Sequence, residues 1–267
     1  MARVDFSRNA AVYDRRHGAV LQADAARRLV DAASLSPGRR ILDVGAGSGR
    51  VAIALAALGS AMVALEPSRA MLAELHAKAA ALPIASAVGE GGRLPFVDAS
   101  FDAVVLARVM YLMSDWRTVL REATRVVGIQ GRLLHEWANG SDAEPWAQIK
   151  EKARSLFEEA GVAAPFHPGA RLESDVDLEL ARLGWIASGE VSLGAGPEMT
   201  LETFLARIVS GECSYVWSVP DAVQRRTLPA LTAWAAERFD LQQPNPMPRE
   251  LTWKIFRQAP STSHQAP

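Results

Sequence analysis

The chain has 267 residues, of which 49% are hydrophobic and 22% are charged, and its formal net charge at pH 7 is −1. This length fits one large domain or one domain with insertions, and the apolar fraction suffices for a full core, so global disorder is excluded. The near-zero net charge disfavours a surface built to neutralise phosphates or to bind anionic lipid.

The first residues and the cysteine content restrict the cellular setting. The opening MARVDFSRNAAVYDRRHG is charged and has no apolar signal-peptide core, and no apolar run reaches the ~18 residues of a membrane span. The single cysteine, Cys213, excludes a disulfide framework, a CxxC redox pair and a multi-cysteine zinc site. The sequence therefore predicts a cytoplasmic protein without a membrane span, and it leaves open whether the chain forms a homodimer.

Alternating strand-like and helix-like periodicity predicts an α/β fold. Seven strands are expected, over residues 40–44, 61–65, 84–88, 101–106, 132–137, 185–193 and 250–257. Helices are expected over residues 20–34, 51–58, 68–80, 115–127, 143–160, 174–183, 200–210 and 220–239. We expect a turn at residues 128–131 and a linker at the proline-rich residues 244–248, because proline cannot donate to a sheet ladder. Parallel strands joined by helices bind ligands at their carboxyl ends.

The segment ILDVGAGSGR, from Ile41 to Arg50, is the most informative part of the chain. A strand ends there, three alternating glycines follow, and a helix begins. Such glycines let the backbone approach a ligand closely, and a helix start offers free N–H groups. The spacing differs from the dinucleotide pattern Gly-x-Gly-x-x-Gly, and no Lys-Ser/Thr pair follows as in a P-loop.

Two carboxylates indicate which ligand this loop binds. Asp43 precedes the first glycine by two residues and would repel a pyrophosphate, whereas S-adenosylmethionine (SAM) carries a sulfonium and an ammonium group and no phosphate. Glu66 closes the second strand, close to the ~20-residue spacing at which related folds place a ribose-binding acid. A carboxylate there can accept hydrogen bonds from both ribose hydroxyls. The competing interpretation is that Glu66 only begins a turn before Pro67 and caps the next helix.

Together with GEGGRLPFVDASFDAVVLARVMYLM at residues 89–113, these motifs resemble the class I SAM-dependent methyltransferases. The resemblance covers about residues 10–137 and is closest to the small-molecule branch with a type 11 methyltransferase-like domain, which includes quinone and natural-product methyltransferases. It implies a Rossmann-like, doubly wound, seven-stranded and mostly parallel sheet with an antiparallel last strand, plus helical lid insertions. It also implies an EC 2.1.1 enzyme that transfers a methyl group from SAM to a small-molecule acceptor and releases S-adenosylhomocysteine.

The resemblance carries over to individual positions of this chain. The cofactor contacts that it implies are Asp43, Gly45, Ala46, Gly47, Gly49, Glu66, Pro67, Glu90, Gly91 and Arg108. Glu90 stands where relatives often have an aspartate that binds the adenine amino group. Two positions depart from the family pattern. Tyr111-Leu112 replaces a frequent His-His pair, which removes a candidate base, and Ile129-Gln130-Gly131 replaces the usual Pro-Gly-Gly turn.

Methyl transfer from a sulfonium is an in-line displacement with a good leaving group, so orientation alone can supply ~7–11 kcal/mol. A general base is needed only if the acceptor must lose a proton. The candidate catalytic residues are His135 at the end of the fifth strand, Tyr13 and His17 in the lead segment, and Tyr111. His167 is a weaker candidate. The structural alternative for His135 is a partly buried histidine at a strand end, and for the lead segment it is a solvated turn. No metal ligands are expected.

The expected organisation is a single domain over residues 1–260 with a flexible tail at 261–267. Its parts are an N-terminal lid at 1–19, a SAM-binding core at 36–140 and an acceptor-side cap insertion at 197–248. The acceptor pocket is expected from Phe6, Tyr13 and His17 of the lead segment and from Tyr215 and Trp217 of the insertion, while Phe204 and Trp234 are expected to pack in a core.

Other classes fit less well. Nucleic-acid amino methyltransferases carry Asp/Asn-Pro-Pro-aromatic after the fourth strand, where this chain has ALARVMY, and Glu212 rather than proline precedes Cys213. Arsenite methylation needs several cysteines, and the clustered acidic ligands of a metal-assisted catechol-type enzyme cannot be assembled from the sequence. A non-catalytic SAM-binding sensor or scaffold stays open, as does a NAD-dependent oxidoreductase, which Asp43 disfavours. The sequence does not identify the acceptor or whether oxygen, nitrogen or carbon is methylated.

Overall fold

The computed structural model of the protein describes residues 6–7, 9–17, 19–79, 81–137, 145–162, 168–192, 198–246 and 252–260. Seven strands form one sheet in the order β3-β2-β1-β4-β5-β9-β6. Their bounds are β1 (Arg40–Val44), β2 (Ala61–Glu66), β3 (Ala85–Val88), β4 (Phe101–Ala107), β5 (Val127–Glu136), β6 (Trp185–Ser192) and β9 (Thr252–Gln258). Strands β1 to β5 pair in parallel, and β9 runs antiparallel to both of its neighbours. The predicted fold is confirmed.

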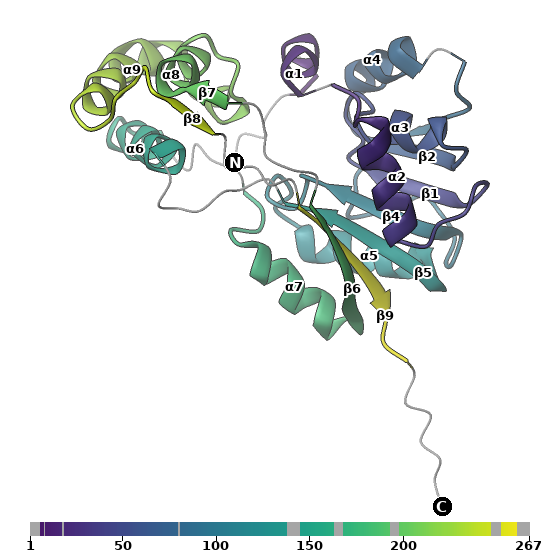
Figure 1. The fold of residues 1–267 in the computed structure, drawn as a ribbon. Coiled ribbons are helices and arrows are strands. Elements are labelled where there is room, and N and C mark those ends of the chain that lie inside the picture. Colours follow the sequence, from purple (N-terminus) through teal and green to yellow (C-terminus); the bar gives the residue numbers. More distant parts are fainter. Residues whose placement is uncertain are drawn as a thin grey trace, which may run out of the picture.

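Helices cover both faces of the sheet (Figure 1). One face packs against α2 (Ala23–Ala32), α3 (Ala52–Ala57) and α4 (Arg69–Ala79), and the other against α5 (Trp116–Val126) and α7 (Glu173–Arg182). Successive side chains of a strand point to opposite faces of the sheet. Ile41 therefore packs in the apolar core beside α2, α3 and α4, and Leu42 packs in the core beside α5 and α7. The sheet is therefore buried on both sides, as parallel sheets are.

A separate group of helices, which we call the cap, lies to one side of the sheet in Figure 1. It comprises α6 (Pro145–Glu159), α8 (Leu201–Val209), the 3₁₀ turn η1 (Ser214–Val216) and α9 (Asp221–Ala236), with a two-stranded ribbon of β7 (Glu198–Thr200) and β8 (Pro244–Pro246). These helices share their own apolar core, to which Phe157 of α6 and Phe204 of α8 contribute. Helix α6 thus packs with the predicted insertion although it precedes residues 197–248.

The proline-rich segment corrects the prediction of a linker. Residues Pro244–Pro246 form β8, which pairs antiparallel with β7. Proline has no backbone N–H to donate, but each strand of a two-stranded ribbon has a partner on one side only. Pro244 and Pro246, on either side of Asn245, are therefore compatible with this pairing. Residues 247–251, the tail at 261–267 and His167 lie outside the described residues.

The expected turn at residues 128–131 is also wrong, because β5 already begins at Val127. Val127 pairs with Phe101, and the register then shifts so that Ala103 pairs with Arg132. The extra residues form a bulge, which a sequence pattern cannot distinguish from a turn. Gly131 lies at its tightest point, where an added Cβ would approach the Asp102 carbonyl oxygen to 2.7 Å.

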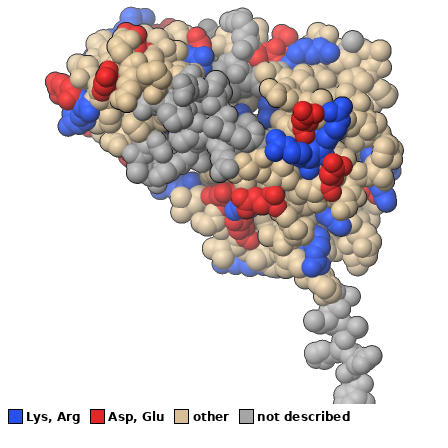
Figure 2. All heavy atoms as spheres, in the orientation of Figure 1, with Lys and Arg blue, Asp and Glu red and all other residues tan. Residues whose placement is uncertain are grey.

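None of the described helices is long and apolar enough to cross a bilayer. On the described part of the face in Figure 2, basic and acidic side chains lie next to one another over much of the sheet region. This distribution agrees with the balanced net charge and offers no extended basic surface there for nucleic acid.

Replacing Gly131 by alanine should destabilise the fold, because its Cβ would overlap the backbone of the bulge. We expect Gly131→Ala to lower the free energy of unfolding by about 1–3 kcal/mol in urea titrations followed by circular dichroism. Gly128→Ala is the matched control, since its Cβ would meet only the Phe101 carbonyl oxygen at 3.7 Å. Equal unfolding free energies for the two variants would contradict the bulge.

Candidate active site

The glycine loop lies at the carboxyl ends of β1 and β4, where the strand order reverses direction. Gly45 has a φ of +73°, and an added Cβ would lie 2.6 Å from Val109 Cγ1. Gly49 has a φ of +89°, and its Cβ would lie 2.7 Å from Leu75 Cγ. Only glycine fits these two positions without strain. The loop therefore has the tight backbone turn, and the location, of a ligand site in an open α/β sheet.

Glu66, at the end of β2, is directly bonded to this loop. Its side chain is buried, with Oε2 accepting a hydrogen bond from the Gly47 N–H at 3.1 Å and Oε1 accepting one from the Ser68 N–H at 3.0 Å. The carboxylate thus stabilises the turn into α4, which is the competing interpretation of Glu66, and it also borders the glycine loop. Both contacts fix its orientation at the edge of the site.

Asp43 is the second acid at the loop, and only 2% of its surface is exposed. Burial raises the pKa of its carboxyl group to about 7, although Arg50 and the backbone N–H of Ala52 favour the charged form. Its proton is therefore exchangeable near neutral pH. A cation that binds beside this group would favour the carboxylate.

Glu136, at the end of β5, is fully buried and forms ion pairs with two arginines. It pairs with Arg50, which begins the segment after the glycines, and with Nη2 of Arg108 at 3.2 Å. Arg108 follows β4 with a φ of +58°, a strained conformation for a side chain of this size. Its Nε is buried and has no hydrogen-bond partner among the described residues. Arg50 and Glu136 were not predicted as site residues from the sequence, although an acid at the end of a parallel strand was a signal for Glu136.

These side chains line a small cavity between the glycine loop and α1 (Ala10–His17). The lining residues are Tyr13, Asp43, Gly45, Ala46, Gly47, Ser48, Arg50, Val51, Ala107 and Arg108. Six of them were predicted from the sequence. The cavity volume is about 40 Å³, far below the ~300–1,000 Å³ of typical ligand pockets. Helix α1 thus covers the loop closely.

The lead segment contacts both the sheet domain, through α4, and the cap, through Trp217. Asp14 forms an ion pair with Lys78 of α4, and Ser7 Oγ donates to Ser68 Oγ at 3.0 Å. The ring of Tyr13 lies 5.4 Å from that of Phe6 and 6.4 Å from that of Trp217 in the cap, with edge-to-face geometry in both cases.

The Phe6 and Trp217 rings are 5.6 Å apart, so the three rings form one group. Burial raises the pKa of Tyr13 even though Arg108 and Arg50 lower it, so the phenol stays protonated at neutral pH.

Other predicted site residues lie outside the cavity. Gly49 packs behind the loop, and Glu90 and Pro67 are exposed. Gly91 is buried where an added Cβ would meet Val44 and Val119. Tyr111 packs edge-to-face on Trp137 at 5.7 Å. Tyr215 is 6% exposed and belongs to the cap core, and its part in an acceptor wall stays a prediction. The side chain of His17 lies outside the described residues.

His135 lies on the opposite face of the sheet from this cavity. Adjacent strand residues face opposite sides, so Glu136 faces the glycine loop and His135 faces α7. His135 has no exposed surface, and burial together with the charge of Lys254 lowers its pKa to about 3. Its role as a base stays a prediction, and its place on the face of the sheet opposite the cavity disfavours that role.

Comparisons with known proteins identify the family of the chain. Residues 42–135 match the family described as "Methyltransferase domain". The demethylmenaquinone methyltransferase of Corynebacterium glutamicum is 36% identical over 174 residues, which cover 61% of this chain and 74% of that protein. The Beutenbergia cavernae enzyme of the same name is 30% identical over 202 residues, which cover 64% and 83%.

Among solved structures, the YcgJ protein of Bacillus subtilis has a TM-score of 0.59 and 16% identity, covering 90% of this chain and all of that one. The [4+2]-cyclase SpnF has a TM-score of 0.53 and 17% identity, covering 89% of this chain and 81% of that one. These likenesses show the fold alone. The sequence relatives show more: the chain belongs to the methyltransferase domain family. It is a methyltransferase of the small-molecule branch, as predicted.

Asp43 should make the cofactor-free protein less stable as pH rises. Its folded pKa of about 7 lies above the ordinary aspartate pKa of 3.8, so the folded state keeps a proton that the unfolded chain has lost. We expect its contribution to lower the free energy of unfolding between about pH 4 and pH 7, by up to about 4 kcal/mol. Urea titrations across this range should show a weaker fall for Asp43→Asn. Asp24→Asn, at an exposed site, should show the same change of unfolding free energy with pH as the wild type. An equal change in all three proteins would refute the raised pKa of Asp43.

Proposed function

We propose that the glycine-loop site binds SAM and that the protein transfers its methyl group to a small aromatic acceptor held under α1 and the cap. The observation that carries this proposal is the charge arrangement around the loop. Two buried acids, Asp43 and Glu66, lie beside two arginines, Arg50 and Arg108, within one site. SAM carries complementary groups: a sulfonium, an ammonium, a carboxylate and a ribose diol.

Each residue has a chemical role that fits this ligand. Glu66 would accept hydrogen bonds from the ribose hydroxyls, since its carboxylate lies at the loop edge. Asp43 would face the ammonium end. The unpartnered Nε of Arg108 supports a role as donor to the methionine carboxylate, because a buried guanidinium N–H without an acceptor is unfavourable. The loop glycines leave the backbone open to close approach.

The protein's contribution to the reaction is orientation and exclusion of water. When bound, SAM supplies a methyl group whose carbon–sulfur bond breaks as the acceptor atom attacks. Tyr13 remains protonated and would position the acceptor by hydrogen bonding rather than remove its proton. The proton that the acceptor loses passes to solvent or to a base. The displacement itself needs no base from the protein. The apolar rings beside Tyr13 would keep water from the reacting atoms.

The three rings also favour a class of acceptor. Phe6, Tyr13 and Trp217 present edges and faces that suit a planar aromatic molecule. Two relatives are named for demethylmenaquinone, a quinone. We therefore propose a quinol-type aromatic acceptor as the first class to assay. The replacement of the family's His-His pair by Tyr111-Leu112 is compatible with a mechanism dominated by orientation.

The small cavity supports the proposal that the lead segment moves during the reaction cycle. About 40 Å³ cannot hold SAM, so residues 1–19 would open for binding and close over the bound molecule. We propose that this lid, the core at 36–140 and the cap at 197–248 together with α6 form the working enzyme.

Glu66→Ala should weaken SAM binding by about ten- to a hundredfold, because a charge-assisted pair of hydrogen bonds worth roughly 1.5–3 kcal/mol is lost. Isothermal titration calorimetry measures this directly. Glu202→Ala, on the exposed surface of α8, is the matched control and should bind normally. An unchanged affinity in Glu66→Ala would remove the ribose role.

Removal of residues 1–19 should leave a folded protein, because the strands lie elsewhere in the chain. It should abolish turnover and shorten the residence time of SAM, since Tyr13 and the Asp14–Lys78 ion pair are lost. Methyl transfer to a quinol acceptor and stopped-flow release of the cofactor provide the two readouts. Full activity of the truncated protein would show that the cap alone closes the site.

A further inference from the structure

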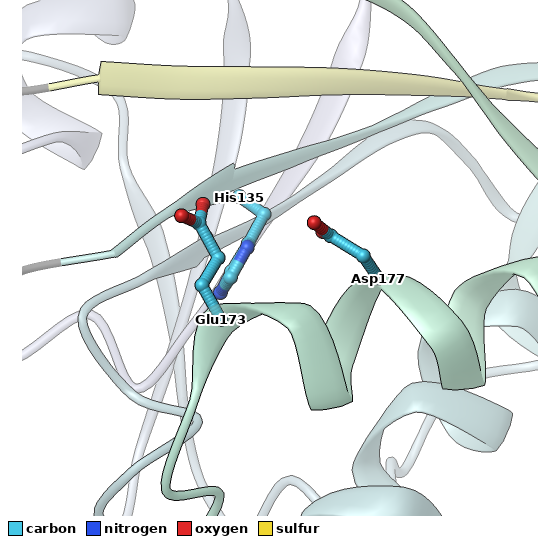
Figure 3. Close-up of side chains that lie close together, drawn as sticks. All are labelled: His135, Glu173 and Asp177. Carbon is cyan, nitrogen blue, oxygen red and sulfur yellow. The ribbon is translucent and has the colours of Figure 1, made fainter.

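A second cluster of polar side chains lies on the face of the sheet that the proposed methyl-transfer site does not use. His135 of β5 and Lys254 of β9 are directly opposite one another in the antiparallel pair. Helix α7 crosses over them and contributes Glu173 and Asp177, which are one turn apart and therefore share a helix face. Figure 3 shows the His135 imidazole between the two carboxylates.

The spacing of these groups suits a metal ion. One imidazole nitrogen and one oxygen from each carboxylate all lie within 4.8 Å of one another. Ligand atoms at about 2.0–2.2 Å from a tetrahedral zinc ion are roughly 3.4 Å apart, so side-chain rotations that bring these atoms about an ångström closer together would place all three in range. Three protein ligands and an open fourth position are a common zinc arrangement.

The ion pairs in this cluster leave the buried His135 side chain without an explanation. It has no exposed surface, and neither ring nitrogen has a hydrogen-bond partner in the described part of the chain. Lys254 Nζ lies 2.7 Å from Asp177 Oδ2 and 3.3 Å from Glu173 Oε1, which balances part of the acidic charge. It leaves the imidazole unsatisfied, and a buried polar group without a partner lowers stability.

We propose that His135, Glu173 and Asp177 bind a divalent transition-metal ion, with Zn²⁺ as the ion that this donor set favours. Imidazole with carboxylates suits zinc, whereas Mg²⁺ prefers oxygen ligands alone. The site is open to solvent because Glu173 and Asp177 are 28% and 33% exposed, and Figure 2 shows acidic side chains gathered over α7. The Lys254 ammonium contacts both carboxylates and would have to move away when the metal binds.

The metal would tie α7 to β5 behind the methyl-transfer site. The segment that leads into α7 is already bonded to the loop after β4, with the Gly169 N–H donating to the Tyr111 carbonyl at 2.9 Å and the Ala170 N–H to that of Met110 at 3.0 Å. The metal would thus hold α7 against the sheet, and the proposal does not depend on SAM binding. The sequence analysis expected no metal ligands because the acids and His135 are far apart in the chain.

Zinc binding to the full-length, chelator-treated protein tests the proposal. Calorimetry should show one saturable Zn²⁺ per chain and a higher melting temperature with zinc, whereas Mg²⁺ should have no such effect. Asp177→Asn and Glu173→Gln should each weaken zinc binding by at least tenfold. Two matched controls, Glu179→Gln on the same helix and His76→Asn on α4, should bind zinc like the wild type.

Lys254→Gln separates a metal site from an ordinary ion-pair cluster. If Lys254 competes with the metal, this variant binds zinc more tightly than the wild type and recovers stability when zinc is added. If the cluster is only an ion pair, the variant loses stability that zinc does not restore. Absence of saturable zinc binding in both proteins, or equal affinity in the wild type and Asp177→Asn, would overturn the proposal. Asp177 is partly exposed, so its variant tests the site even if a change at buried His135 prevents folding.

Discussion

One buried carboxylate, Glu136, holds the functional edge of the sheet together. A fully buried charge must be paired, and removing its partners typically destabilises a protein by about 3–5 kcal/mol. Glu136 meets this requirement with two arginines from different parts of the chain, Arg50 after the glycine loop and Arg108 after β4. The ends of β1, β4 and β5 are thereby fixed relative to one another. The strained backbone at Arg108 is held by the same ion pair and by its N–H bond to the Glu136 carbonyl.

This arrangement gives the site an alternating charge pattern. Arg50, which neutralises Glu136, also lowers the pKa of Asp43, and Arg50 and Arg108 both lower the pKa of Tyr13, in each case against the larger effect of burial. The loop is therefore ready for a ligand that carries charges of both signs. Phe6 and Tyr13 of the lead segment contact Trp217 of the cap, so the proposed cofactor and acceptor sites would share a single group of aromatic rings.

Features that depend on neighbouring residues in the chain were predictable from the sequence. The bounds of β1 agree residue for residue, because a buried apolar run ended by glycines is a local pattern. The bulge in β5 and the β7–β8 ribbon were not predictable, since both depend on pairing with a distant strand.

The two neighbours at the end of β5 illustrate the same limit at the site. The sequence places His135 and Glu136 at the carboxyl edge but does not say which of them faces the glycine loop. A shift of one residue exchanges the two faces, so the choice of His135 as a base depended on a register that only the sheet defines. Arg50 was missed for a related reason, because its partner Glu136 lies 86 positions away.

The structure of the complex with S-adenosylhomocysteine tests this account most directly. The account predicts that the ribose hydroxyls lie within hydrogen-bond distance of Glu66, that the amino-acid end lies between Asp43 and Arg108, and that the sulfur faces the ring group of Phe6, Tyr13 and Trp217. A complex in which the ligand binds away from the glycine loop, or in which Glu66 and Arg108 make no contact with it, would contradict the account.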